Sequence, residues 1–162
     1  MQGHVDAGLS LYETGLQRGY LHHYDVLFAP SLAARGDRIG ALGILVLAYQ
    51  DKPDLIGPLF RSITDPTFAD RERQEAINIV SAGLSDYELP LEAFWILKAY
   101  DQIAAVPLPE APLIWWAPGD SGWLRSPARK IMMKQWRLPE YWRRHGFPPQ
   151  CKAIGESDFD CH

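Results

Sequence analysis

Two cysteines near the C-terminus are the residues with the clearest capacity for chemistry. Cys151 and Cys161 are the only cysteines in the 162-residue chain. In an oxidising compartment they would form a disulfide, whereas in a reducing cytosol they would stay as packed thiols. They could also help to bind zinc, because His145 and His162 lie nearby, although no standard zinc-finger spacing is present. The sequence leaves these alternatives open and marks the pair as a candidate disulfide.

A second candidate site is aromatic. Trp115, Trp116 and Trp123 lie in a proline-rich segment, residues 106–123, and Trp142 follows in the C-terminal part. Large indole rings either pack between two parts of a protein or line the wall of a ligand pocket. The sequence therefore predicts a candidate ligand pocket at these four tryptophans, with packing in the core as the alternative.

No set of nucleophile, acid and base can be assembled from this sequence. It contains no Gly-x-Ser-x-Gly elbow and no His-Glu-x-x-His motif, and the glycines around Gly40 lack the spacing of a phosphate-binding loop. The adjacent His22 and His23 would point about 100° apart on a helix, which is unfavourable for one shared metal. We therefore predict no catalytic residue, no cofactor and no metal, which favours a non-enzymatic role.

Charge is unevenly distributed along the chain. Residues 1–123 carry 8 Lys and Arg against 16 Asp and Glu, whereas residues 124–162 carry 8 against 4. Glu156, Asp158 and Asp160 lack the glycine and final glutamate of a calcium loop, so we expect them to pair with the basic helices. A basic part that docks on an acidic body explains the pattern better than nucleic-acid binding, since the overall pI is about 5.7.

The longest apolar run extends from Ile39 to Tyr49. It is about half as long as the ~20 residues that a membrane-spanning helix needs. The first ten residues also lack the basic and apolar regions of a secretory signal. We therefore expect no membrane span in this chain, and we interpret the run as a helix in the centre of the core.

The remaining pattern predicts short helices. Apolar residues spaced by three and four predict an amphipathic helix over residues 5–18. Further helix starts are 13 to 19 residues apart, which is the size of one helix and a turn and is typical of α-solenoids. These starts are Asp37, Pro53, Pro66 and Ser85. The predicted fold class is all-α, with short helices packed as a degenerate tetratricopeptide-like array, a Trp-rich C-terminal cap and an irregular tail.

We interpret the chain as one domain, residues 1–162. At this length a domain buries ~68–70% of the surface that its unfolded chain exposes, so it can fold without disulfides or a bound metal. The predicted parts are a helical array over residues 1–105, a Pro- and Trp-rich connection over residues 106–123, and a cap over residues 124–162.

Within the cap, two short helices precede the tail. The first begins at Pro127, with Ile131 expected on its apolar side and Arg129 on its polar side. The second contains Tyr141 and Trp142, which we expect to bury their rings. After these helices no helical pattern fits the sequence.

The segment LPEYWRRHGFPPQCKAIGESDFDC gives the cap a recognisable ending. With the preceding helix it covers about 38 of 162 residues and resembles the C-terminal signature of a large group of proteobacterial proteins. Many of these are winged-helix transcriptional regulators whose C-terminal half is a tetratricopeptide-like array. This chain departs from the pattern at Arg129, where the family usually has Phe, and at Trp136-Arg137, where a glycine-containing pair is usual. The pattern's positions are occupied by Trp142, Gly146, Pro148, Cys151, Phe159 and Cys161.

The resemblance implies an α-helical sensor or interaction half without the DNA-binding half, and it implies no catalytic residues. Two functions follow as hypotheses. The first is a module that binds a protein or peptide, and the second is a small-molecule sensor with a pocket near Trp115, Trp116 and Trp123. An upstream winged helix and membrane span would place the domain in the periplasm, and without them we expect it in the cytoplasm.

Overall fold

The computed structural model describes residues 10–11, 14–15, 17–18, 23–83, 88–105 and 121–161. The predicted helix over residues 5–18 and the predicted connection over residues 106–123 lie largely outside the described residues. The described residues form two compact units, one ending at Ala99 and the other beginning at Tyr100. The interpretation as one domain of three parts stays a prediction.

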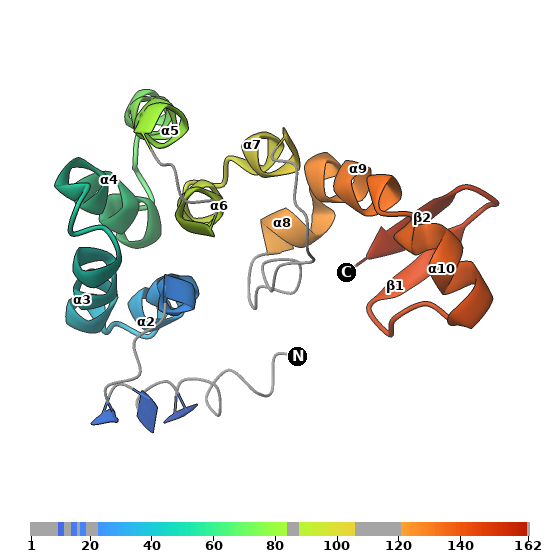
Figure 1. Cartoon of the computed structure of the whole chain (residues 1–162), viewed down its shortest axis with the longest axis horizontal. Coiled ribbons are helices and arrows are strands. Elements are labelled where there is room, and N and C mark those ends of the chain that lie inside the picture. Colours follow the sequence, from blue (N-terminus) through green and yellow to red (C-terminus); the bar gives the residue numbers. More distant parts are fainter. Residues whose placement is uncertain are drawn as a thin grey trace. The chain divides into compact units, whose positions relative to one another are not determined.

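Most described residues are helical, which broadly confirms the all-α prediction, and a small two-stranded sheet is added to the helices (Figure 1). The N-terminal unit contains the 3₁₀ helix η2 (His23–Phe28) followed by α2 (Ala29–Ala34), α3 (Arg38–Ala48), α4 (Pro53–Thr64), α5 (Asp70–Gly83) and α6 (Glu88–Ile96). The C-terminal unit contains α7 (Tyr100–Ala105), α8 (Ser121–Arg125), α9 (Pro127–Gln135), α10 (Leu138–His145), β1 (Cys151–Ile154) and β2 (Asp158–Cys161).

Local capping chemistry sets several of the helix starts. The Asp37 side chain accepts a hydrogen bond of 2.8 Å from the backbone nitrogen of Gly40, so Asp37 caps α3 as predicted. Pro53 is the first residue of α4, again as predicted, because proline at this position loses no helical hydrogen bond. The predicted start at Ser85 lies outside the described residues.

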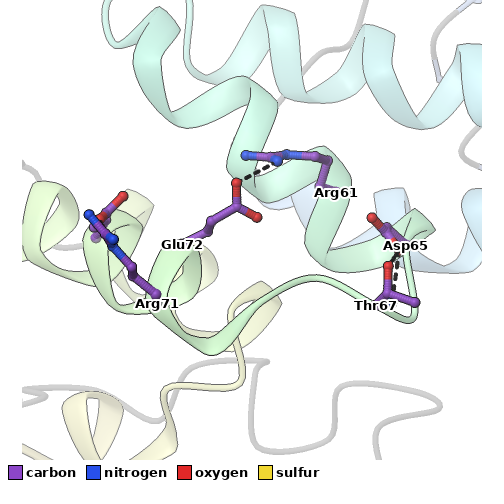
Figure 2. Close-up of polar contacts among 6 residues, drawn as sticks. Arg61, Asp65, Thr67, Arg71 and Glu72 are labelled. Carbon is purple, nitrogen blue, oxygen red and sulfur yellow. Dashed lines mark hydrogen bonds and ion pairs between the residues drawn. The ribbon is translucent and has the colours of Figure 1, made fainter.

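The prediction of a helix start at Pro66 is wrong. Asp65 instead forms a turn, in which its Oδ1 accepts hydrogen bonds from the Thr67 backbone nitrogen at 2.8 Å and from Thr67 Oγ1 at 2.6 Å. Figure 2 shows this turn between α4 and α5, beside the ion pair of 2.7 Å that joins Arg61 to Glu72 across the two helices. The hydrogen bonds from Thr67 lower the pKa of Asp65. This turn delays the start of α5 to Asp70.

The core of the N-terminal unit combines aliphatic residues from every helix with the aromatic residues Phe68, Phe94 and Trp95. Leu45, Leu55 and Leu59 are fully buried, and Tyr49 is buried beside them at the end of α3. Each helix packs on the next one along the chain, α2 also contacts α4, and α4 contacts α6. The 3₁₀ helix η2 contacts both α3 and α6, so the first and last described elements of the unit also meet. The Ser62 hydroxyl donates a hydrogen bond of 2.9 Å to the carbonyl of Ile96, which ties α4 to the end of α6.

The prediction that the apolar run at residues 39–49 lies in the centre of the core is wrong. Only one side of α3 is buried, through Ala41, Ile44 and Leu45. The other side is open to solvent, and Figure 1 shows α3 between its neighbours α2 and α4. A helix that is apolar around its whole circumference can bury either side, and the neighbouring helices select which side that is.

The tail is predicted to be irregular, but in the structure it forms an antiparallel hairpin. Strand β1 pairs with β2 so that Cys151 lies opposite Cys161 and Ala153 lies opposite Phe159. The turn between the strands uses Gly155, whose φ of +58° favours glycine. Polar and apolar residues alternate in β2, DFDC, but β1, CKAI, buries only Cys151 and shows no such pattern, so the sequence gives no sign of a paired hairpin.

Packing of the two cap helices also differs in part from the prediction. Arg129 is buried and Ile131 is 53% exposed, the reverse of the prediction. The buried face of α9 therefore includes Arg129 and excludes Ile131. In α10, Trp142 is buried as expected, whereas Tyr141 is 57% exposed and lies against the ring of His145. The side chain of Arg129 therefore occupies core space at the position where the resembled pattern usually has Phe.

Candidate functional site

Cys151 and Cys161 form a disulfide in the structure, at directly opposed positions of the hairpin. Both residues are buried, and the described part of the chain contains no free cysteine. No group of three or more metal-ligating side chains suited to a metal ion occurs among the described residues. Of the alternatives left open by the sequence, the disulfide is the one that the structure supports.

The disulfide belongs to a buried cluster that holds the hairpin against α9 and α10. The ring of Trp142 lies edge-on to Phe159, with 5.6 Å between ring centroids, and it lies 5.7 Å from the ring of Phe147. We call this the cap cluster. Its members are Met133, Trp142, Cys151, Phe159 and Cys161, with Leu138 and Phe147 packed against them.

The residues that carry the resemblance are those that build this ending. Four of the six matched residues are members of the cap cluster. Of the other two, Gly146 ends α10 with a φ of +100°, a conformation that favours glycine, and the Pro148 carbonyl accepts a hydrogen bond of 2.8 Å from Cys151. The motif therefore has a structural role in this chain, because each matched residue packs, turns or bonds the end of the cap.

One carboxylate joins the hairpin to α9. Asp158 makes ion pairs with Lys130 at 2.7 Å and with Lys134 at 3.0 Å, and its backbone carbonyl accepts a hydrogen bond from Arg143. The hydrogen bonds from Lys130 and Lys134 lower the pKa of the Asp158 carboxyl well below its ordinary value. This agrees with the expectation that an acid of the tail pairs with the basic helices.

Asp158→Asn is expected to lower the melting temperature at neutral pH, because it removes the carboxylate from between two lysines. The folded-state pKa of Asp158 lies below its unfolded value of about 3.9. The carboxylate therefore contributes stability above about pH 4, and this contribution is lost as the pH falls toward the folded-state pKa. Thermal melts of both proteins between pH 2 and pH 8 should show a difference that shrinks in acid. A difference independent of pH would contradict this assignment.

The predicted ligand pocket is only partly within the described residues. Trp115 and Trp116 lie outside them. Trp123 is fully buried in α8, with its ring 5.5 Å from the ring of Tyr100, and Trp142 is buried in the cap cluster. These two rings occupy core positions, and the pocket stays a prediction.

Each unit contains a buried polar side chain whose pKa is shifted. In the N-terminal unit, Tyr49 is buried near Glu92. Burial raises the pKa of the Tyr49 hydroxyl, and the nearby carboxylate raises it further. In the C-terminal unit, Arg129 Nη1 donates a hydrogen bond of 3.1 Å to the carbonyl of Leu124, which ties α9 to α8. Burial lowers the pKa of Arg129 to about 10, so it stays charged at neutral pH.

Among the described residues of the N-terminal unit, most of the exposed large apolar side chains lie on α3, where the sequence predicts a buried helix. Ile39 is 87% exposed and Leu47 is 53% exposed, although both are large aliphatic residues. Gly43 lies between them on the same side, and an added Cβ there would meet nothing within 4 Å. We call this surface the α3 outer face. Its members are Ile39, Leu42, Gly43, Val46 and Leu47.

A surface of this kind indicates binding more than catalysis. The α3 outer face contains no titratable group and no polar side chain that could orient a small ligand. Soluble proteins rarely leave several large aliphatic side chains side by side in water unless another apolar surface covers them. The arrangement can therefore bury apolar area against a partner.

No helix among the described residues is long and apolar enough to cross a membrane. Comparisons of the chain with protein-family models, with curated proteins and with solved structures found no match.

Proposed function

We propose that this protein is a non-catalytic helical interaction module that binds a protein or peptide through the α3 outer face. The observation that carries the proposal is the exposure of Ile39, Leu42, Val46 and Leu47 on one side of a single helix. Burying apolar surface is favourable by roughly 25 cal/mol per Å². These residues are spaced as i, i+3, i+7 and i+8, which is the spacing of residues on the one face of a helix that contacts a partner.

The packing of the N-terminal unit supports an array-like scaffold for this face. Contacts between each helix and the next, with α2 also touching α4 and α4 also touching α6, resemble those of a degenerate tetratricopeptide-like array, although the contact of η2 with α6 closes the unit on itself. In such arrays every repeat rests on its neighbours, so a helix can keep one side for binding without loss of the fold. We infer that α3 has this role.

We infer further that the cap closes the module at its C-terminal end, as the resemblance to the helical half of proteobacterial winged-helix regulators implies. The support is the convergence of matched residues in the cap cluster around the Cys151–Cys161 disulfide. The buried aromatic residues of the cap cluster supply apolar packing within this end of the chain. Under this proposal the specificity of binding lies in α3, and the cap supplies stability.

A photo-crosslinking experiment tests the proposed function. A photoreactive amino acid replaces Leu42 in the full chain, and a matched protein carries it at Ile79, which lies on α5 and is exposed to a similar degree, 40% against 38%. Irradiation in extract of the source cells should give protein adducts at position 42 that are absent at position 79. Adducts of equal amount and identity at both positions, or none at either, would refute binding through the α3 outer face.

A further inference from the structure

One ridge of the α3 outer face is symmetric about Gly43. Ile39, Gly43 and Leu47 are spaced by four residues and form one ridge along the helix, with a large aliphatic residue at each end and glycine in the middle. Leu42 and Val46 form a second ridge beside it. Because nothing lies within 4 Å of a Cβ at Gly43, the backbone of another helix can approach closely at this point.

This pattern is complementary to itself when two copies cross in antiparallel orientation. If two α3 helices cross at Gly43, Ile39 of each copy lies near Leu47 of the other. Apolar side chains then meet apolar side chains at both ends of the crossing, and the small glycine meets glycine at the centre. A two-fold axis requires a surface that fits itself in this way.

Charges at the two ends of α3 favour the same orientation. The exposed residues around its start, Arg35, Asp37 and Arg38, carry a net positive charge; the Asp37 carboxylate caps the helix, and the Arg38 guanidinium donates a hydrogen bond of 3.0 Å to the Thr64 carbonyl. The exposed residues just after its end carry a net negative charge. They are Asp51, Lys52 and Asp54. Antiparallel crossing brings the positive end of one copy to the negative end of the other and opposes the helix dipoles, whereas parallel crossing places like charges together.

We propose that the occupant of the α3 outer face is a second copy of this chain, docked antiparallel across α3 with its crossing point at Gly43. The proposal rests on the proposed function, because it names the partner of the same surface. It makes the protein a two-fold dimer whose interface is formed by the N-terminal unit. The native disulfide lies in the C-terminal unit.

Cysteine cross-linking tests the crossing point. Gly43→Cys is compared with Gly57→Cys in the full chain, because both glycines are exposed on helices and an added Cβ meets nothing within 4 Å at either one. Mild oxidation should give a disulfide-linked dimer with Gly43→Cys and leave Gly57→Cys monomeric on a non-reducing gel. Equal cross-linking of the two variants, or none with Gly43→Cys, would overturn the proposed geometry.

Sedimentation equilibrium of the unmodified chain tests the partner itself. We expect dimers, with Ile39→Glu raising the dissociation constant at least tenfold and the α5 control Ile79→Glu leaving it unchanged. A chain that is monomeric at all concentrations would overturn the second copy as occupant. The proposed function would then be judged separately, since adducts of another protein at position 42 would uphold it and equal adducts at positions 42 and 79 would refute it.

Discussion

Deletion of residues 138–162 is expected to unfold the C-terminal unit or to make it aggregate. The deletion removes α10 and the hairpin, and it strips Trp142 and Phe159 from the cap cluster, which leaves Met133 on α9 uncovered. Burial of one large apolar side chain contributes ~1.5–3 kcal/mol, and a domain has only ~5–15 kcal/mol of net stability. Circular dichroism and light scattering of the truncated chain would show loss of the cooperative melt or formation of aggregates.

A matched variant separates packing from covalent closure. Cys151→Ser with Cys161→Ser removes the disulfide and keeps every other member of the cap cluster, together with the ion pairs of Asp158. We expect a cost of about 2–4 kcal/mol from the lost constraint on the unfolded chain, with the fold retained. A truncated chain that stayed monomeric and melted within a few degrees of the full one would show that the cap is a loose appendage.

The second large effect is expected from a pair of substitutions on α3. Leu45→Glu places a carboxylate in the core of the N-terminal unit, where Leu45 is fully buried, and should destabilise it by at least about 4 kcal/mol. Leu47→Glu, two residues further along, places the same side chain on the α3 outer face, where Leu47 is 53% exposed. A surface substitution of this kind should change the free energy of unfolding by no more than about 0.5 kcal/mol.

Urea unfolding of the two variants below the dimer concentration range gives the comparison, since both substitutions introduce the same residue into the same helix. The account requires a large loss at position 45 and almost none at position 47. Similar losses at both positions would mean that α3 is buried on all sides, as the sequence had predicted, and would remove the basis of the proposed function.

The sequence predicted those features of the fold that depend on local chemistry. The starts of α3 at Asp37 and of α4 at Pro53 follow from a capping carboxylate and from a proline in the first turn, which act within a few residues. At Asp65 the same reasoning failed, because the side chain bonds to Thr67 in a turn instead of capping a helix. Asp caps helices and turns with similar geometry, and only the following backbone separates the two cases.

Features that depend on tertiary contacts could not be predicted in the same way. The residues of α3 are apolar on all sides, so their spacing does not indicate which side the neighbouring helices cover. Arg129 was assigned to a polar side because a charged residue is rarely buried, yet its guanidinium reaches the carbonyl of Leu124 within the C-terminal unit. The hairpin depends on the pairing of two short strands and on the Cys151–Cys161 bond.

The candidate site was predicted only in part for the same reason. The two cysteines were correctly marked as a candidate disulfide, since they are the only pair in the chain. Of the tryptophans proposed as a pocket, Trp123 and Trp142 lie in core positions. The α3 outer face was missed, although the lack of any charged residue between Ile39 and Leu47 was visible in the sequence and is its one local signal.

The most direct test of the α3 outer face as a binding surface is the rate at which a thiol on it is labelled. Leu47→Cys and the α5 control Ile79→Cys each introduce one free thiol, because the native cysteines are joined as a disulfide. In the dilute isolated chain, the account predicts rapid labelling of both by a maleimide. After addition of an excess of the unmodified chain, labelling at position 47 should slow and labelling at position 79 should not. Slow labelling at position 47 in the isolated chain, or equal rates at both positions after the addition, would contradict the account.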